Sequence, residues 1–275
     1  MKIEIGESLA LSYLKHVKKC VLYQNNWKIS SKWAKPNEEE NKNKDDKTVE
    51  GKVFEEIKII FKDIFKSDTL NQTLKQAEID ALGMDKEGKV YAVDVAFHEG
   101  NLNYKGGTAN CVKKKLLRSY LILLRYFPDR DYDIIFASPK VGPTVNSDIC
   151  NVLKFNKSKA DNKEINKSEL NDFEKLKRFL NDNIEFKNKV RFIYISNEYF
   201  KKGFLYNTIE ASESDSDTNE LFMRSYKLFQ LFNKAPNSKA KKTESDDNEI
   251  PPIASVVLDF EPSDENAIQA ITDKS

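Results

Sequence analysis

The sequence of 275 residues is poor in the residue types that build disulfide frames, zinc sites and catalytic triads. Its three cysteines are odd in number and widely spaced, and its only histidines are His16 and His98. Such sparse cysteines predict a reducing compartment and no disulfide bonds. No cysteine–histidine set has the spacing of a zinc site, and two histidines support no Ser-His-Asp or Cys-His arrangement.

Long hydrophobic runs are missing as well. No apolar run approaches the roughly 20 residues that a membrane helix needs. Near the N-terminus, Glu4 and Glu7 interrupt the region where a signal peptide would carry its apolar stretch. Gly106 and Gly107 lack the spacing and the following Lys-Ser/Thr of a phosphate-binding loop. These absences predict a cytoplasmic protein with no membrane partner.

The charge is distributed unevenly along the chain. From residue 237 onward there are four lysines and nine acidic residues, a net −5, which leaves +6 for the rest of a chain whose total is +1. A modestly basic body is compatible with nucleic-acid binding, although a solvated surface explains it equally well. Composition predicts a core over residues 1–140 with a flexible insertion at 36–48, an α/β extension over 141–235 and a flexible acidic tail over 236–275.

Apolar spacing predicts most of the helices and strands. Residues 5–20, 53–65 and 110–127 have helical periodicity, and the last of these segments ends at Pro128. The ranges 145–155, 168–184 and 221–232 also predict helices. Strands are expected at 20–27, 133–138 and 191–196, with some strand character over 250–260. The amides of 24–26 either contact bases or lie in a plain loop.

The most informative stretch is a predicted β-hairpin over residues 78–96. Its two strands are joined by a short polar turn that ends in Gly88. Asp80 lies in the first strand and Asp94 in the second, which is apolar and rich in β-branched residues. A carboxylate in a buried strand is costly unless it is paired or binds a metal. Two of them on adjacent strands predict a site for a hard divalent cation.

This hairpin resembles that of the PD-(D/E)XK nuclease superfamily, in which two acids and one backbone carbonyl hold magnesium and a lysine orients the attacking water. The resemblance covers about residues 50–140 and assigns these roles to Asp80, Asp94 and the Val95 carbonyl. It implies a restriction-endonuclease-like central mixed sheet flanked by helices, with a helical C-terminal extension. The predicted order of helix, acidic strand pair, helix and strand agrees with that core. At the position of the motif lysine, however, the chain has Ala96.

A lysine from the following helix is the natural replacement. The apolar residues of 112–127 span an arc centred near Lys113 when each residue is rotated by about 100°. Lys113 is therefore expected on the core-facing side, with Asp80 and Asp94 as acidic partners, and Lys115 is the second choice. The simpler interpretation is that Lys113 lays its stem along apolar neighbours and its ammonium at the surface.

The resemblance leaves the remaining site residues open between functional and ordinary roles. Members of the family often carry a further glutamate on the first core helix, for which Glu55 and Glu7 compete. Either one also suits the dipole at a helix N-terminus without any metal. His98 lies on the same strand face as Asp94 and either contacts the site or the solvent. Candidate phosphate contacts on the long helix, which are otherwise a solvated face, are Lys114, Lys115 and Arg118.

The sequence thus predicts a Mg²⁺- or Mn²⁺-dependent nuclease that hydrolyses DNA phosphodiester bonds. One alternative is a degenerate nuclease fold that binds nucleic acid or protein without cutting, which Ala96 favours. Another is an unrelated α/β interaction protein in which Asp80 and Asp94 are structural. A homodimer, or a protein partner bound through the C-terminal tail, is compatible with either alternative.

Overall fold

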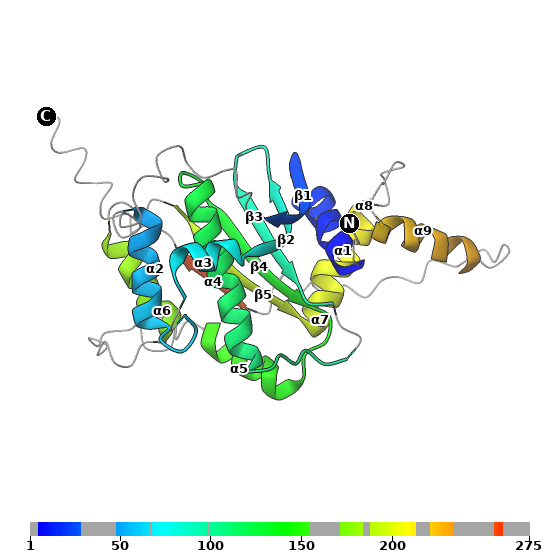
Figure 1. Cartoon of the computed structure of the whole chain (residues 1–275). Helices are drawn as coiled ribbons and strands as arrows, with labels where there is room; N and C mark the ends of the chain where they lie inside the picture. Colours follow the sequence, from blue (N-terminus) through cyan, green and yellow to red (C-terminus); the bar gives the residue numbers. More distant parts are fainter. Residues whose placement is uncertain are drawn as a thin grey trace, which may run out of the picture.

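The structure is a computed structural model, and it describes residues 5–28, 48–65, 68–97, 100–153, 171–183, 188–212, 221–233 and 256–260. Most of the predicted insertion at 36–48 and most of the predicted tail at 236–275 lie outside these ranges. Within them the chain forms an open α/β sheet with helices on both faces (Figure 1).

The described strands form a six-stranded sheet in the order β1-β2-β3-β4-β5-β6. The first three, β1 (Leu22–Lys28), β2 (Glu78–Met84) and β3 (Val90–Val95), form an antiparallel meander. Strands β3, β4 (Tyr132–Ser138) and β5 (Val190–Ser196) are parallel, and β6 (Val256–Phe260) pairs antiparallel with β5. The hairpin turn follows from Gly88, whose φ of 85° is one that glycine adopts without strain.

One face of the sheet carries five helices in the part of the chain that the structure describes. They are α2 (Val49–Ile60), α3 (Leu70–Lys75), α4 (Thr108–Tyr126), α5 (Pro143–Leu153) and α6 (Asp172–Asp182). The parallel strands β3 and β4 are connected through α4, as parallel neighbours require a crossover. Side-chain caps start three of these helices: Thr69 and Asn171 each form a capping box with the residue three positions on, and the Thr48 hydroxyl accepts a hydrogen bond from the Gly51 N–H at the start of α2.

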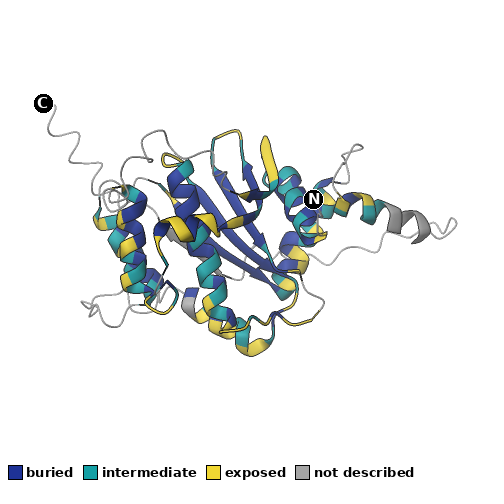
Figure 2. Ribbon diagram, viewed as in Figure 1, coloured by how far each residue is buried: buried dark blue, intermediate teal, exposed yellow. Residues whose placement is uncertain are grey.

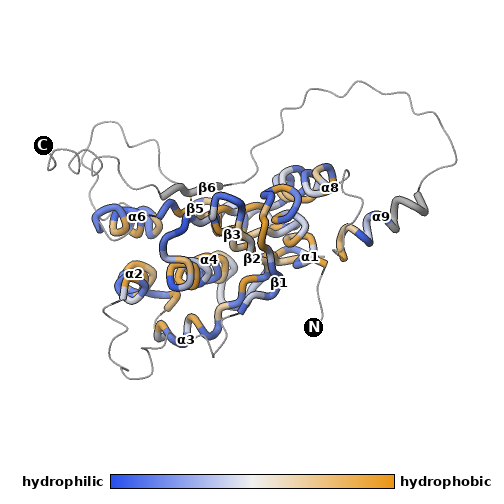
Figure 3. Tube along the Cα trace, turned by 90° about the horizontal axis from the view of Figure 1, so that it is seen from above, coloured by the Kyte–Doolittle hydropathy of each residue, from blue (hydrophilic) through white to orange (hydrophobic). Residues whose placement is uncertain are grey.

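The opposite face carries a second set of helical segments, all of them short. These are α1 (Ile5–Ser12) with the π-helical turn Tyr13–Val17, α7 (Asn197–Tyr199) with the π-helical turn Phe200–Tyr206, and α8 (Asn207–Ser212). Helix α9 (Leu221–Asn233) contacts α1 and extends away from the sheet (Figure 1). Seen from above, α2, α3 and α4 lie on one side of the sheet and α1 and α8 on the other (Figure 3).

Each face of the sheet is covered by its own hydrophobic core, so the central strands β3, β4 and β5 are buried on both sides, whereas the edge strand β1 is largely exposed (Figure 2). The larger core lies under α2 to α6 and includes Phe54, Leu116 and Phe192. The smaller core lies under α1 and the second π-helical turn, where Tyr13 stacks on Phe204 with ring centroids 4.3 Å apart. Burial on both faces explains why the parallel strands are continuous apolar runs rather than alternating ones.

The expected α/β class and the main predicted elements are confirmed, with boundaries that differ by a few residues. The order of helix α1, a three-stranded meander, helix α4 and strand β4 agrees with the expected core order, except that α2 and α3 are inserted between β1 and β2. Strands β5 and β6 join the same sheet, so the region after residue 140 contributes strands to it. No described helix is both long and apolar enough to cross a membrane.

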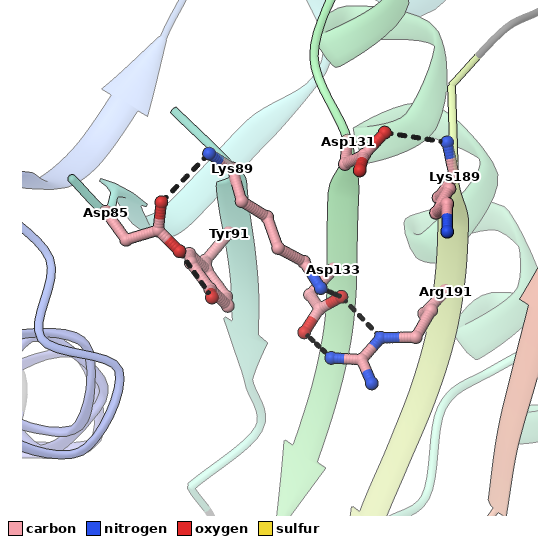
Figure 4. A network of polar contacts seen from close by, with 7 residues as sticks. All are labelled: Asp85, Lys89, Tyr91, Asp131, Asp133, Lys189 and Arg191. Carbon is pink, nitrogen blue, oxygen red and sulfur yellow. Dashed lines mark hydrogen bonds and ion pairs between the residues drawn. The ribbon is translucent and has the colours of Figure 1, made fainter. Parts of the chain in front are cut away.

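A buried ionic network ties the first residues of the parallel strands together (Figure 4). Asp133 on β4 is fully buried and is held by Arg191 from β5, whose Nε donates at 2.7 Å, and by Lys89 before β3, also at 2.7 Å. Beside it, Asp85 accepts hydrogen bonds from the Lys89 backbone N–H and the Tyr91 hydroxyl. Burial alone would raise the pKa of Asp133, but these two cations outweigh it and hold the pKa below its usual value.

Candidate functional site

The two acids of the hairpin meet at the point where strands β2 and β3 stop pairing. The backbone register pairs Ala81 with Val93, and its continuation places Asp80 opposite Asp94. The same reasoning on the other side of β2 places Asn26 opposite Asp80, because Asn25 pairs with Ala81 and Trp27 with Ile79. Three polar residues, Asn26, Asp80 and Asp94, therefore lie in one row across β1, β2 and β3.

The sheet is irregular at this row. Asn26 has a φ of 49°, in the left-handed region that asparagine tolerates better than most residues. Ile79 packs in the core beneath α4, whereas Ala81, two residues further on, packs beneath α1. A regular strand would place both on the same face. The break opens the end of the β2–β3 ladder and makes Asp80 accessible to groups from both faces of the sheet.

At this opening the Asp80 side chain takes the place of a backbone carbonyl as the hydrogen-bond acceptor for the end of β3. Its Oδ2 accepts a hydrogen bond from the Val95 backbone N–H at 2.8 Å. No hydrogen bond from another described residue reaches its Oδ1. Burial, followed by the nearby charge of Asp94, raises the pKa of Asp80 to about 7, and Lys115 opposes this effect. A carboxylate whose proton affinity is raised by a second carboxylate lies in a negative field that favours an added cation.

Asp94 is almost completely buried, with 2% of its surface exposed, and both of its oxygens have partners. Lys115 on α4 donates from Nζ to Oδ1 at 3.2 Å. Ser119, one turn further along the same helix, donates from Oγ to Oδ2 at 3.0 Å. Asp94 raises the pKa of Lys115 above its usual value, so this side chain keeps its proton at neutral pH.

Lys115, and not Lys113, is the lysine that reaches the acids. The Nζ atom of Lys113 instead lies 3.9 Å from Oδ2 of Asp172 on α6. The prediction that Lys113 lies beside the two aspartates was therefore wrong. Residues two positions apart in the sequence lie about 200° apart around a helix, so Lys113 and Lys115 point to different sides of α4. The apolar arc gave the wrong direction because α4 is packed against α2, α3 and α5 as well as β3 and β4. The centre of the apolar arc therefore points toward neighbouring helices rather than toward the sheet.

The position of Lys115 is consistent with the place left by the missing motif lysine. Ala96 is buried in the core on the α4 side of the sheet, the same side from which Lys115 approaches Asp94. A lysine at position 96 would therefore point toward α4. In this chain Lys115 reaches the Asp94 carboxylate from α4 toward the sheet, which is the opposite direction.

Of the two candidate glutamates, the structure brings Glu7 to the site and leaves Glu55 away from it. Glu7 in the first turn of α1 accepts a hydrogen bond from Nδ2 of Asn26 at 2.7 Å, and its charge contributes to the raised pKa of Asp80. Gly6 makes the close approach of α1 possible, because a Cβ there would lie 2.6 Å from Cβ of Phe97. Glu55 on α2 is half-exposed and pairs with Lys58 instead.

Three residues of this site were not predicted from the sequence as parts of it. Ser119 is a polar residue inside the apolar segment of α4, which is a weak signal that a buried partner faces it. Tyr104 lies in the loop before α4. Burial raises the pKa of its hydroxyl, the charge of Lys115 lowers it, and the charges of Asp94 and Asp80 raise it. Asn26 stands in an amide-rich run with nothing to distinguish it from its neighbours.

The predicted phosphate contacts on α4 have partners within the chain. Lys114 lies 2.8 Å from Asp68, and Arg118 donates to the Gln76 side chain at 2.8 Å. Phosphate binding by either residue would have to share or replace these contacts. His98 lies outside the described residues, so its predicted place near Asp94 stays a prediction.

The two carboxylates are oxygen donors of the kind that a hard cation such as Mg²⁺ prefers, and they lack the nitrogen and sulfur donors that are typical of zinc sites. Among the described residues, no three His, Cys, Asp or Glu side chains lie close enough to hold a metal together. Magnesium is commonly held by only one or two carboxylates, with water and substrate phosphate as its other ligands. Asp80 and Asp94 meet that requirement, and the Val95 carbonyl is the third predicted donor. Glu7 adds negative charge beside them without forming a three-carboxylate set.

Comparison of the chain with protein-family models, with curated proteins and with solved structures finds no match.

Proposed function

We propose that the protein is a metal-dependent nuclease that hydrolyses DNA phosphodiester bonds with Mg²⁺ or Mn²⁺. The observation that carries the proposal is the convergence of Asp80, Asp94 and Lys115 at the open end of the β2–β3 ladder. Two carboxylates and one ammonium are the groups that this chemistry needs, and three different elements supply them. The order of helix, meander, crossover helix and parallel strand around them supports the resemblance to PD-(D/E)XK nucleases.

Each residue has a role that follows from its contacts. Asp80, whose Oδ1 accepts no hydrogen bond from a described residue, and Asp94 would hold the cation. When bound, such a cation lowers the pKa of a bound water and neutralises charge that develops on phosphate. Lys115 is protonated, so it would orient the attacking water and stabilise negative charge rather than remove a proton. Ser119 fixes the Asp94 carboxylate through its hydrogen bond to Oδ2.

The test is a cleavage assay with plasmid, linear duplex and single-stranded DNA, in Mg²⁺, Mn²⁺ or a chelator. The wild-type protein should cut at least one substrate only when a divalent ion is present. Lys115→Met should lose cleavage by about 100-fold or more. Lys113→Met provides the matched control, since it removes a lysine from the same helix that points to Asp172, and it should retain activity. Equal loss in both variants, or cleavage in the chelator, would contradict the proposal.

One observation favours a second candidate function, a degenerate nuclease fold that binds nucleic acid without cutting it. Both oxygens of Asp94 are already engaged by Lys115 and Ser119, so a cation must compete with an internal ammonium. Binding of labelled DNA to the wild-type protein without cleavage in any divalent ion would support this candidate. The same binding accompanied by Mn²⁺-dependent cleavage would exclude it.

A further inference from the structure

Asn26 connects the first helix to the row of acids. It lies on β1 opposite Asp80, and its amide donates to Glu7 Oε2 on α1 at 2.7 Å. The contact spans nineteen positions in the sequence and joins a strand to a helix on one face of the sheet. A carboxylate at a helix start is free to point into solvent, so a specific acceptor contact of this kind fixes its direction.

The backbone conformation of Asn26 is constrained. Its φ of 49° is sparsely populated by residues other than glycine, and such residues cluster at functional sites. Gly6 indicates the same constraint from the other side, because the close packing of α1 on Phe97 leaves no space for a Cβ. The glycine and the left-handed asparagine together hold Glu7 next to the end of β3.

We propose that Asn26 is a positioning residue that holds Glu7 beside Asp80 and so sets the affinity of the acidic site for a divalent cation. This inference depends on the proposed function, because it assumes that Asp80 and Asp94 bind the cation. Glu7 then supplies additional negative charge and hydrogen-bond acceptors at the site. Residues that orient the groups around a metal commonly change its affinity by 10- to 100-fold when they are replaced.

The variant Asn26→Gly removes the amide and keeps a residue that adopts a positive φ without strain. Asn197→Gly is the matched control: Asn197 also has a positive φ, of 52°, and its side chain accepts a hydrogen bond from the Val141 N–H at 2.9 Å. Both variants lose one side-chain hydrogen bond of a left-handed asparagine. A comparable loss of melting temperature is therefore expected from both, which separates stability from metal binding.

The measurement is the affinity for Mn²⁺ by titration calorimetry of the metal-free full-length protein. Asn26→Gly should weaken binding about tenfold, Asn197→Gly should bind like the wild type, and Glu7→Gln should weaken binding at least as much as Asn26→Gly. The double variant Asn26→Gly/Glu7→Gln should bind no more weakly than Glu7→Gln, because Asn26 acts through Glu7.

The outcomes separate this inference from the proposed function. Unchanged Mn²⁺ affinity in Asn26→Gly overturns the role of Asn26 and leaves the nuclease proposal standing. Additive losses in the double variant also overturn it, since Asn26 would then act independently of Glu7. Absence of Mn²⁺ binding by the wild-type protein overturns the metal site, and both proposals with it.

Discussion

Replacing Asp80 with asparagine should stabilise the metal-free protein at neutral pH. The pKa of this carboxyl rises from 3.8 to about 7 through burial and the charge of Asp94. An unfolded aspartate releases its proton near pH 4. Between about pH 4 and pH 7 the unfolded chain thus loses a proton that the folded protein keeps, and the folded state becomes less favourable as pH rises. The penalty is absent below this window and complete above it.

The size of the effect follows from the same pKa change. Each pKa unit corresponds to about 1.4 kcal/mol, which gives an upper limit of about 4 kcal/mol. Partial exposure of the side chain allows water to screen the charge, so we expect about 1–2 kcal/mol. Asparagine can still accept the Val95 N–H through its amide oxygen, so the hydrogen bond to β3 is retained.

The assay is urea unfolding of the wild type and Asp80→Asn in a chelator, from pH 4 to pH 8.5. The difference in unfolding free energy should be near zero at the acidic end and should favour the variant above pH 7. Glu55→Gln, which removes a half-exposed carboxylate away from the site, is the control for the loss of a carboxylate elsewhere. If Asp80→Asn is less stable than the wild type at pH 8, then Asp80 is a structural acceptor, and the argument that it is held at an energetic cost is refuted.

Three further predictions concern the groups that support the site and the sheet. Asp133→Asn should cost about 3 kcal/mol in urea unfolding at pH 7, because it leaves two cations without their buried partner. The pKa of Asp133 is lowered in the folded protein, so the stability advantage of the wild type is complete above about pH 4 and is lost as pH falls through that lowered pKa. Ser119→Ala should cost about 1–3 kcal/mol by removing a buried donor from Asp94, and an unchanged melting curve would show that this bond contributes nothing. Gly6→Ala should cost about 1–3 kcal/mol because its methyl group meets Phe97, and thermal unfolding at wild-type temperature would show that α1 moves aside freely.

The sequence was sufficient to predict the acidic hairpin, because its signals are local. A polar turn ending in glycine and two short strands with central acids specify Asp80 and Asp94 without reference to the rest of the chain. Most of the longer helices were predicted for the same reason. The short helix α3 was missed, although the capping box of Thr69 and Gln72 was present in the sequence.

The lysine and the supporting residues depend on tertiary packing and could not be obtained from a single periodicity. Helix α4 is buried on several sides, so the centre of its apolar arc indicates an average direction and misplaces Lys113. Choosing between Glu7 and Glu55 needed the position of α1 over the end of β3. Tyr104 approaches from a loop whose course no local pattern specifies.

Anomalous scattering from a crystal of the protein soaked in Mn²⁺ tests the proposed metal site most directly. A manganese peak is expected between the carboxylates of Asp80 and Asp94, with Lys115 beside it on the α4 side of the sheet. A soaked crystal with no peak at these carboxylates, and with Lys115 still bonded to Asp94, would contradict the proposed metal site.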